Sequence, residues 1–286
     1  MMSSPLFTPF TLNVGGRLVL LERPWIMGIL NVTPDSFYEA SRCSCDEAAI
    51  VGRVDAIVEE GGDIIDIGAY SSRPGADDVS LEEEWRRLDK ALAIVRKLYP
   101  AGFVSVDTFR AEIARRCVEE YGVQMVNDIS GGTLDDAMFE TIAKLQVPYV
   151  LMHMRGTPQT MQQNTGYADL MADMTDYFVR RIDRLHQLGV GDIILDPGFG
   201  FGKTLEDNYR LIRRLDEFRV LEKPLLVGIS RKSMIYKLLD CSPEESLTGT
   251  IVLGTMALLA GASILRVHDV REAVQTVKIV TKTVSV

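Results

Sequence analysis

Short apolar runs alternate along the chain with longer segments of helical periodicity. The runs are rich in β-branched residues and cover residues 25–32, 63–69, 103–108, 125–130, 149–154, 193–198, 225–230 and 264–269. In the segment 81–98, by contrast, apolar residues recur at the spacing of one helix face, at Leu81, Trp85, Leu88, Leu92 and Val95. Gly61, Gly122 and Gly189 follow such segments, and glycine is preferred where helices end.

This alternation predicts an α/β protein. Near-continuous apolar strands are typical of a parallel sheet covered by helices. Eight strands, each followed by a helix, predict a (β/α)8 TIM barrel. An open doubly wound sheet is the alternative, but it would have fewer strands and a glycine fingerprint after the first one, which this sequence lacks.

The N-terminal segment departs from the strand-helix alternation. Residues 11–22, TLNVGGRLVLLE, predict a β-hairpin with a Gly-Gly turn, which we expect to plug the barrel floor. No linker, charged block or low-complexity segment divides the chain. We therefore predict one domain over residues 1–286, with residues 1–10 disordered.

Composition and charge narrow the function classes. A chain of 286 residues suits a single barrel, and 47% hydrophobic residues are ample for its core. The net charge of −9 argues against nucleic-acid binding, which needs a basic face. The spacing of Cys43, Cys45, Cys117 and Cys241 fits neither a zinc ribbon nor a redox pair. We see no signal peptide and no run long enough to span a membrane, so we expect a cytoplasmic protein.

Every predicted strand ends in polar residues. They are Asn31, Asp66, Asp107, Asn127, Asp128, His153, Asp196, Ser230, Arg231, Lys232, Arg266, His268 and Asp269. In a barrel these ends share one mouth, where the chemistry of this fold is found. A lone aspartate there is commonly a helix N-cap or turn residue, and Asp128 and Asp269 fit that interpretation. The recurrence on all eight strands indicates a polar ligand, because an unpaired buried polar group costs about 1–3 kcal/mol.

Two kinds of chemistry are present among these residues. Asp107, Asn127 and Asp196 suit a flat heterocycle with ring N–H and amino groups. Positive charge comes from Arg73, Lys232, Arg266 and His268. Loops 7 and 8 of this fold often bind phosphate, and arginine forms bidentate contacts with phosphate oxygens. The pattern therefore favours a polar heterocycle that carries phosphate.

Eight motifs occur in order from residue 29 onward. They are ILNVTPDSF (29–37), SSRPGA (71–76), SVDT (105–108), NDISGG (127–132), LMHMRGTPQTMQ (151–162), DPGFGFGK (196–203), GISRKS (228–233) and RVHDV (266–270). Together they resemble the dihydropteroate synthases, from about Thr11 to the C-terminus. The resemblance implies a transferase of folate biosynthesis and sulfonamide target. Such an enzyme joins 4-aminobenzoate to 6-hydroxymethyl-7,8-dihydropterin diphosphate and releases pyrophosphate, and we expect an SN1-like substitution.

The resemblance also implies residue roles. The pterin would contact Asp107, Asn127, Asp196 and Lys232, with Met152 and Phe201 against the faces of its ring. The diphosphate would bind Arg73, Arg266 and His268 near Ser72, and Asn31 would hold Mg2+ with it. A first mobile loop would contain Thr33, Pro34, Asp35 and Phe37. A second mobile loop would contain Ser71, Ser72, Arg73 and Pro74. The two loops, together with Ser230 and Lys232, would enclose 4-aminobenzoate. The family implies a homodimer through the C-terminal helices.

The chain departs from the family pattern in both loops. After Phe37 the segment 38–42 lacks the usual glycines, and Tyr70 stands where the family has glutamate. Two alternatives therefore stay open: a pterin-binding methyltransferase barrel, and a catalytically impaired pterin-binding protein. Release of pyrophosphate in the presence of both substrates would separate a synthase from either.

Overall fold

The computed structural model describes residues 7–33, 46–70 and 79–285. The predicted hairpin is present: β1 (Phe10–Val14) pairs antiparallel with β2 (Arg17–Leu21). Gly15 and Gly16 form its turn with φ of 58° and 83°, the left-handed values that a tight hairpin turn requires. Of the residues expected to be disordered, Phe10 opens β1, whereas residues 1–6 lie outside the described range.

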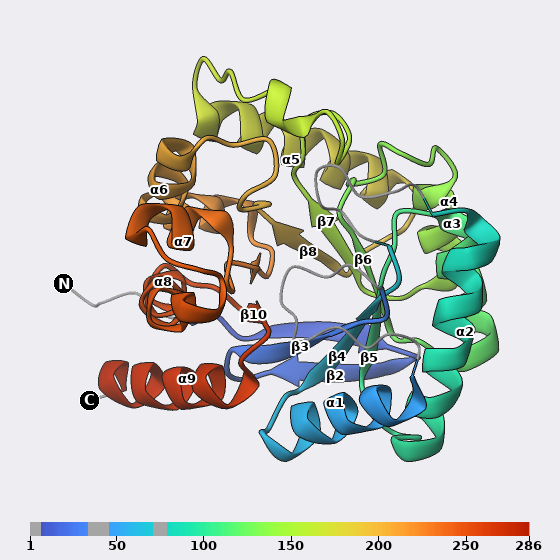
Figure 1. Ribbon diagram of the computed structural model, residues 1–286. Helices are drawn as coiled ribbons and strands as arrows, with labels where there is room; N and C mark the ends of the chain where they lie inside the picture. Colours follow the sequence, from blue (N-terminus) through green and yellow to red (C-terminus); the bar gives the residue numbers. More distant parts are fainter. Residues whose placement is uncertain (1–6, 34–45, 71–78, 286) are drawn as a thin grey trace.

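Eight parallel strands form the predicted barrel (Figure 1). They are β3 (Trp25–Asn31), β4 (Ile64–Gly68), β5 (Val104–Asp107), β6 (Met125–Asp128), β7 (Tyr149–Met152), β8 (Ile193–Asp196), β9 (Leu226–Val227) and β10 (Ile264–Val267). The hydrogen-bonded order is β8-β7-β6-β5-β4-β3-β10-β9. A bridge between Leu195 and Leu225 joins the two ends of this order. The closed order confirms the barrel and excludes the open doubly wound sheet.

Helices cover the outside of the barrel (Figure 1). They are α1 (Glu47–Glu59), α2 (Leu81–Leu98), α3 (Ala111–Tyr121), α4 (Met138–Leu145), α5 (Leu170–Gln187), α6 (Leu205–Arg213), α7 (Ser233–Leu239), α8 (Leu247–Leu259) and α9 (Val270–Val284). Helix α2 spans the predicted segment, and Ser80 caps it by accepting a hydrogen bond from the Glu83 amide. Gly122 caps α3 with φ of 60°, as predicted. Among the described residues, no helix has the length and apolar character needed to cross a membrane.

The side chains inside the barrel form layers, because alternate residues of a strand point to opposite faces of the sheet. The lowest inward layer is apolar and consists of Met27, Ile64, Met125, Val150, Ile194, Leu226 and Ile264. Leu12 and Leu21 of the hairpin pack against this layer and are buried. The hairpin therefore closes the floor of the barrel, as predicted.

The next inward position on several strands is polar. Each of these polar residues follows the floor residue of its own strand by two positions. They are Asp66 on β4, Asn127 on β6, Asp196 on β8 and Arg266 on β10. Each of them points to the same side of the sheet as its floor residue. Only one apolar layer thus separates the hairpin from a polar layer beneath the open mouth.

Candidate functional site

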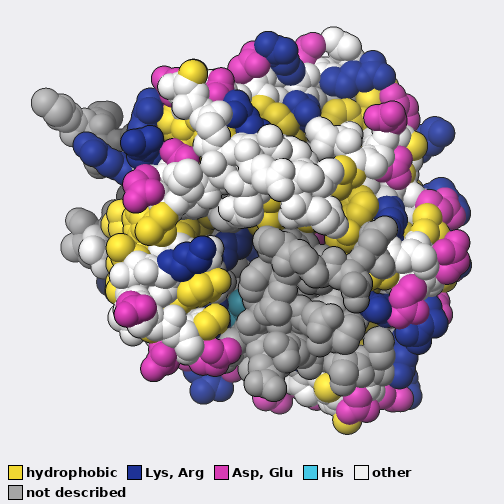
Figure 2. Space-filling model, turned by 45° about the horizontal axis from the view of Figure 1, so that its top comes forward, with side chains coloured by type: hydrophobic (Ala, Val, Ile, Leu, Met, Phe, Trp, Pro, Cys, Tyr) yellow, Lys and Arg dark blue, Asp and Glu magenta, His cyan; other side chains and the backbone are white. Residues whose placement is uncertain are grey.

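A cavity of about 690 Å3 opens at the carboxyl ends of the strands. Predicted site residues that line it are Asn31, Thr33, Asp107, Phe201, Ser230, Lys232, Arg266 and His268. Tyr70, Gln162 and Lys203 line it as well. Over the described residues of the face shown in Figure 2, acidic and basic side chains are interspersed. A cavity of this volume suits a small-molecule ligand.

The β3–β6 strand register sets side chains in a row at the mouth. Gly68 pairs with Asn31 on one side and Asp107 on the other, and Asp107 pairs with Asn127. A Cβ atom at Gly68 would lie 3.4 Å from Asn31 Oδ1 and 3.4 Å from Asp107 Cβ. The glycine therefore leaves space in which an amide oxygen and a carboxylate converge.

Arg266 connects this row to the polar layer below. Its Nε donates to Asp66 Oδ2 at 2.7 Å, and its Nη2 donates to Asp107 Oδ2 at 2.7 Å. Asn127 Nδ2 donates to the same Asp66 oxygen at 3.1 Å. Asp66 is fully buried, and its position at a strand end was the sequence signal that could have placed it in the site. Four strands thus contribute to one hydrogen-bonded cluster in the barrel centre.

Burial alters the ionisation of the mouth residues. It raises the pKa of Asp107 above the usual range of a carboxyl group, while Arg266 opposes that rise. Burial lowers the pKa of His268 well below its ordinary value, and the nearby charges of Arg266 and Arg53 lower it further. His268 is therefore neutral near pH 7. The prediction that His268 adds positive charge is therefore wrong. His268 can offer only a neutral imidazole to an anion.

Lys232 lines a second part of the cavity, and its charge acts on the buried Asp196. Asp196 Oδ1 accepts a hydrogen bond from the Gly198 amide at 2.7 Å. Burial raises the pKa of Asp196, and the charge of Lys232 opposes this effect. Lys232 Nζ donates to the Phe199 carbonyl at 2.6 Å and lies 4.7 Å from the centre of the Phe201 ring. Burial lowers the pKa of Lys232 to about 8.

An apolar wall adjoins this pair. Met152 is the register partner of Asp196, and it clusters with Met154, Met161 and the partly buried Phe201. Polarizable methionine and aromatic side chains suit contact with a flat ring. The wall contains Met152 and Phe201, the two residues that the resemblance assigns to the ring faces.

Two aspartates were interpreted as caps or turn residues. Asp128 accepts hydrogen bonds from the amides of Ser130 and Gly132, at 2.7 and 2.8 Å, which confirms the turn role. Asp269 stands at the N-cap position of α9 but forms no side-chain capping bond. Its carboxylate instead binds Arg231 at 2.8 and 2.9 Å, because that guanidinium is buried beside it. Asp269 therefore occupies the predicted N-cap position, but its carboxylate pairs with Arg231 and does not cap the helix.

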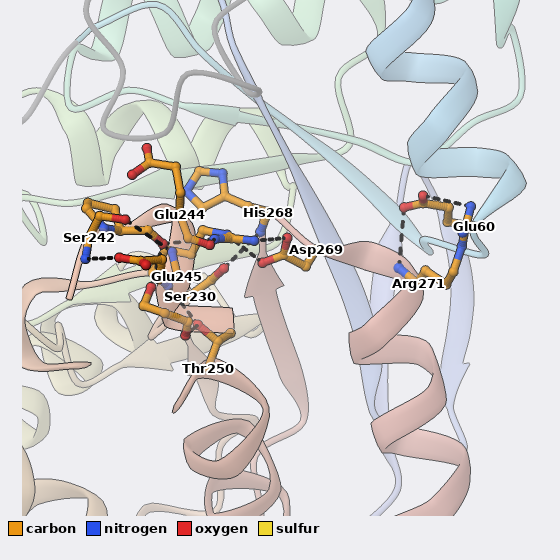
Figure 3. A network of polar contacts seen from close by, with 12 residues as sticks. Glu60, Ser230, Ser242, Glu244, Glu245, Thr250, His268, Asp269 and Arg271 are labelled. Carbon is orange, nitrogen blue, oxygen red and sulfur yellow. Dashed lines mark hydrogen bonds and ion pairs between the residues drawn. The ribbon is translucent and has the colours of Figure 1, made fainter. Parts of the chain in front are cut away.

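Arg231 has a left-handed backbone with φ of 53°, which costs energy in a residue other than glycine. Its Nη1 donates to the carbonyls of Pro243 and Glu244, and its amide donates to Thr250 Oγ1. Figure 3 shows Glu244, Thr250, His268 and Asp269 gathered in this network. The contacts hold the turn that carries Ser230 and Lys232, and Ser230 Oγ accepts from the His268 amide at 3.1 Å.

Both predicted loops fall largely outside the described residues. These are Pro34, Asp35 and Phe37 of the first loop and Ser71, Ser72, Arg73 and Pro74 of the second. Thr33 is buried, and Tyr70 packs edge-on against Phe109 with ring centres 4.9 Å apart. The Tyr70 hydroxyl accepts a hydrogen bond from Gln159 Nε2 at 3.1 Å. Tyr70 therefore joins the loops that follow β4, β5 and β7.

The chain is similar to proteins of known activity. Residues 27–268 match the family described as pterin binding enzyme. A dihydropteroate synthase of Escherichia coli K12 is 42% identical over 272 residues, which cover 94% of this chain and 95% of that protein. The Yersinia pestis dihydropteroate synthase solved with a sulfonamide drug has a TM-score of 0.90 at 38% identity, covering 96% of this chain and 99% of that one. The Xanthomonas albilineans dihydropteroate synthase solved with 4-aminobenzoic acid has a TM-score of 0.87 at 36% identity, covering 98% and 100%.

Proposed function

The chain belongs to the dihydropteroate synthases of the pterin binding enzyme family, and we propose that it condenses 4-aminobenzoate with 6-hydroxymethyl-7,8-dihydropterin diphosphate. The observation that carries this proposal is that Asp107, Lys232 and Arg266 line one cavity. Asn127 joins them through the buried Asp66, and the charge of Lys232 acts on the buried Asp196. The carboxylates and the amide would pair with the N–H and amino groups of the pterin. Lys232 would contact the pterin ring, and Arg266 and the imidazole of His268 would face the diphosphate.

The chemistry follows from this placement of charge. The bond between the pterin methylene carbon and the diphosphate oxygen breaks, and its electron pair leaves with pyrophosphate. Cationic groups that neutralise the leaving oxygens stabilise this step. The electron-rich dihydropterin, with Asp107 and Asp196 beside it, stabilises the resulting cation. The amino nitrogen of 4-aminobenzoate then forms the new C–N bond and loses a proton, so no strong base is needed.

We propose that Mg2+ takes part together with the diphosphate. Asn31 Oδ1 and the Asp107 carboxylate converge over Gly68, and oxygen ligands of this kind suit Mg2+. No group of three or more His, Cys, Asp or Glu residues that could hold a metal occurs within the described ranges. This fits an ion held by one or two protein oxygens plus substrate phosphates. When bound, Mg2+ would neutralise charge on the diphosphate.

Two rival functions make different predictions in one assay. A methyltransferase barrel or an impaired pterin-binding protein would bind a pterin but release no pyrophosphate with 4-aminobenzoate. We expect initial rates of pyrophosphate release that saturate with each substrate and need Mg2+. Tight pterin diphosphate binding without turnover would favour the impaired protein, and methyl transfer from methyltetrahydrofolate would favour the methyltransferase.

The lowered pKa of Lys232 predicts how substrate affinity depends on pH. With a pKa of about 8, the ammonium is present below pH 8 and is lost above it. The KM for the pterin diphosphate should therefore rise between pH 8 and 9.5. Lys232→Arg stays charged over this range and should shift the rise to higher pH. An unchanged rise in Lys232→Arg would show that another group causes it.

We propose that the enzyme is a homodimer through α8 and α9, which lie side by side in Figure 1. Val252, Met256 and Leu259 follow one face of α8 and are 52%, 42% and 47% exposed, and Ile279 of α9 is 67% exposed. Exposed apolar side chains in one area are typical of an interaction surface.

The dimer proposal predicts the effect of a buried charge at this surface. Met256→Glu or Ile279→Glu should weaken association by about 10- to 100-fold, because an unpaired carboxylate would be desolvated. Sedimentation over a concentration series measures this effect. Val179→Glu, on exposed apolar Val179 of α5, is the matched control and should leave the association unchanged. Wild-type protein that stays monomeric at high concentration would contradict the proposal.

We propose that the protein is cytoplasmic, as the sequence analysis predicts. Cys117 and Cys241 are free thiols within the described residues. Free thiols agree with a reducing compartment. Fluorescence imaging of the tagged chain in its own cells tests this location.

A further inference from the structure

The loop that follows β8 has a backbone that only glycine permits. Gly198, Gly200 and Gly202 alternate along it with φ of 67°, 82° and 59°. A Cβ atom at Gly198 would lie 2.2 Å from the His153 carbonyl oxygen, so the loop approaches the end of β7 too closely for any side chain there. Three carbonyl oxygens of the loop, those of Gly198, Phe199 and Phe201, accept hydrogen bonds from lysine side chains.

Lys203 occupies the inside of this loop. Its side chain is buried, with 3% of the residue exposed. Its Nζ lies 3.0 Å from the carbonyl oxygens of both Gly198 and Phe201. The carbonyl oxygen and Nδ1 of His153 are 3.4 and 3.1 Å away. An ammonium group has three donors, so these four acceptors satisfy it completely.

The acceptor role of His153 agrees with its surroundings. Burial lowers the pKa of His153 well below its ordinary value, and the charge of Lys203 lowers it further. The imidazole is therefore neutral, and its Nδ1 can accept from Lys203. Burial also lowers the pKa of Lys203 to about 7.

The same loop forms part of the proposed pterin site. Its Gly198 amide donates to Asp196, its Phe199 carbonyl accepts from Lys232, and its Phe201 ring lies beside that ammonium. Lys203 therefore holds two carbonyls of the loop, and Lys232 holds the carbonyl of Phe199 between them. A change at Lys203 would reach the cavity through Asp196, Lys232 and Phe201.

We infer that Lys203 is a positioning residue for the pterin: its buried ammonium fixes the glycine loop and thereby the slot formed by Asp196, Phe201 and Lys232. This inference rests on the proposed function, because it assumes that the slot takes the pterin ring. Lys203 lines the cavity, but its ammonium is taken up by the loop carbonyls and His153, so we expect its effect on the ligand to be indirect. Small misplacements of site groups are known to lower catalytic efficiency by about 100-fold.

The test compares the two substrates in one variant. Lys203→Met should raise the KM for the pterin diphosphate by about 10- to 100-fold. The KM for 4-aminobenzoate should rise several-fold less, because Lys232 is the one slot residue that is also expected in the 4-aminobenzoate pocket. Lys144→Met, at an exposed lysine of α4, is the matched control and should change neither value. Lys203→Gln keeps two donors for the loop carbonyls and should recover part of the loss. If a thermal melt shows that Lys203→Met is not folded, Lys203→Gln is used for the comparison instead.

Two results would overturn this role. An unchanged KM for the pterin diphosphate in a folded variant would show that Lys203 does not set the slot. Equal increases for both substrates would show a general structural effect. Calorimetric titration with the pterin diphosphate alone separates this inference from the proposed function. If the wild-type chain binds the pterin diphosphate and releases no pyrophosphate with 4-aminobenzoate, the proposed function fails while the binding comparison at Lys203 still decides the inference.

Discussion

Asp196→Asn should lower kcat/KM for the pterin diphosphate by about 100- to 1000-fold. The variant keeps the size of the side chain and an oxygen that can accept from the Gly198 amide, so the loop should stay in place. It replaces a buried negative charge opposite Lys232 with a neutral amide. An amide also presents N–H groups where the pterin edge needs acceptors. We therefore expect both weaker pterin binding and less stabilisation of the cation.

Initial-rate kinetics with both substrates measure this effect, and a thermal melt verifies the folded state. Asp216→Asn, at an exposed aspartate in the segment between α6 and β9, is the matched control and should retain wild-type rates. If a folded Asp196→Asn enzyme turns over at the wild-type rate with the wild-type KM, the assignment of Asp196 to the pterin site is wrong.

Arg266→Met should have the largest effect on stability. Arg266 is the cation that binds both Asp66 and Asp107, and Asp66 is fully buried. Removing one partner of a buried ion pair leaves the other charge uncompensated, which costs about 3–5 kcal/mol in free energy of unfolding. Urea denaturation at pH 7.5 measures this loss, and we also expect pyrophosphate release to fall to background.

A pH series tests the cause of this loss. Without Arg266, the pKa of Asp107 should rise further above its unfolded-state value. A raised carboxyl pKa destabilises the folded state most above that pKa, so the defect should shrink as the pH falls and Asp107 takes up a proton. Arg180→Met removes the exposed pair with Asp176 and should change stability by less than about 1 kcal/mol. A pH-independent defect in Arg266→Met would indicate lost packing rather than an uncompensated charge.

The sequence predicted the barrel because each strand and helix has a clear period. Inward residues of β4 alternate from Ile64 to Asp66, and those of β10 from Ile264 to Arg266, so the polar mouth followed from the same pattern. The partners within the mouth did not follow from it. Arg266 reaches Asp66 and Asp107 from β10 across β3, and such a pairing depends on strand stagger and side-chain length.

The charge states of site residues could not be predicted from the sequence either. The same holds for the contacts of residues that support the site from outside it. The neutral state of His268 results from its burial among cations contributed by distant segments. The carboxylate of Asp269, the N-cap residue of α9, binds Arg231, whose left-handed backbone no sequence pattern indicated. Lys203 was part of a quoted motif, yet two of its four acceptors belong to His153, which only the fold brings beside it.

The central claim is that the cavity joins the two substrates, and product analysis with labelled 4-aminobenzoate tests it most directly. The purified chain, Mg2+, the pterin diphosphate and 15N-labelled 4-aminobenzoate are incubated, and pyrophosphate and dihydropteroate are quantified by mass spectrometry. We predict equal amounts of pyrophosphate and 15N-labelled dihydropteroate, and neither product when 4-aminobenzoate is omitted. Pyrophosphate formed without labelled dihydropteroate, or no pyrophosphate at all from a chain that binds the pterin, would contradict the account.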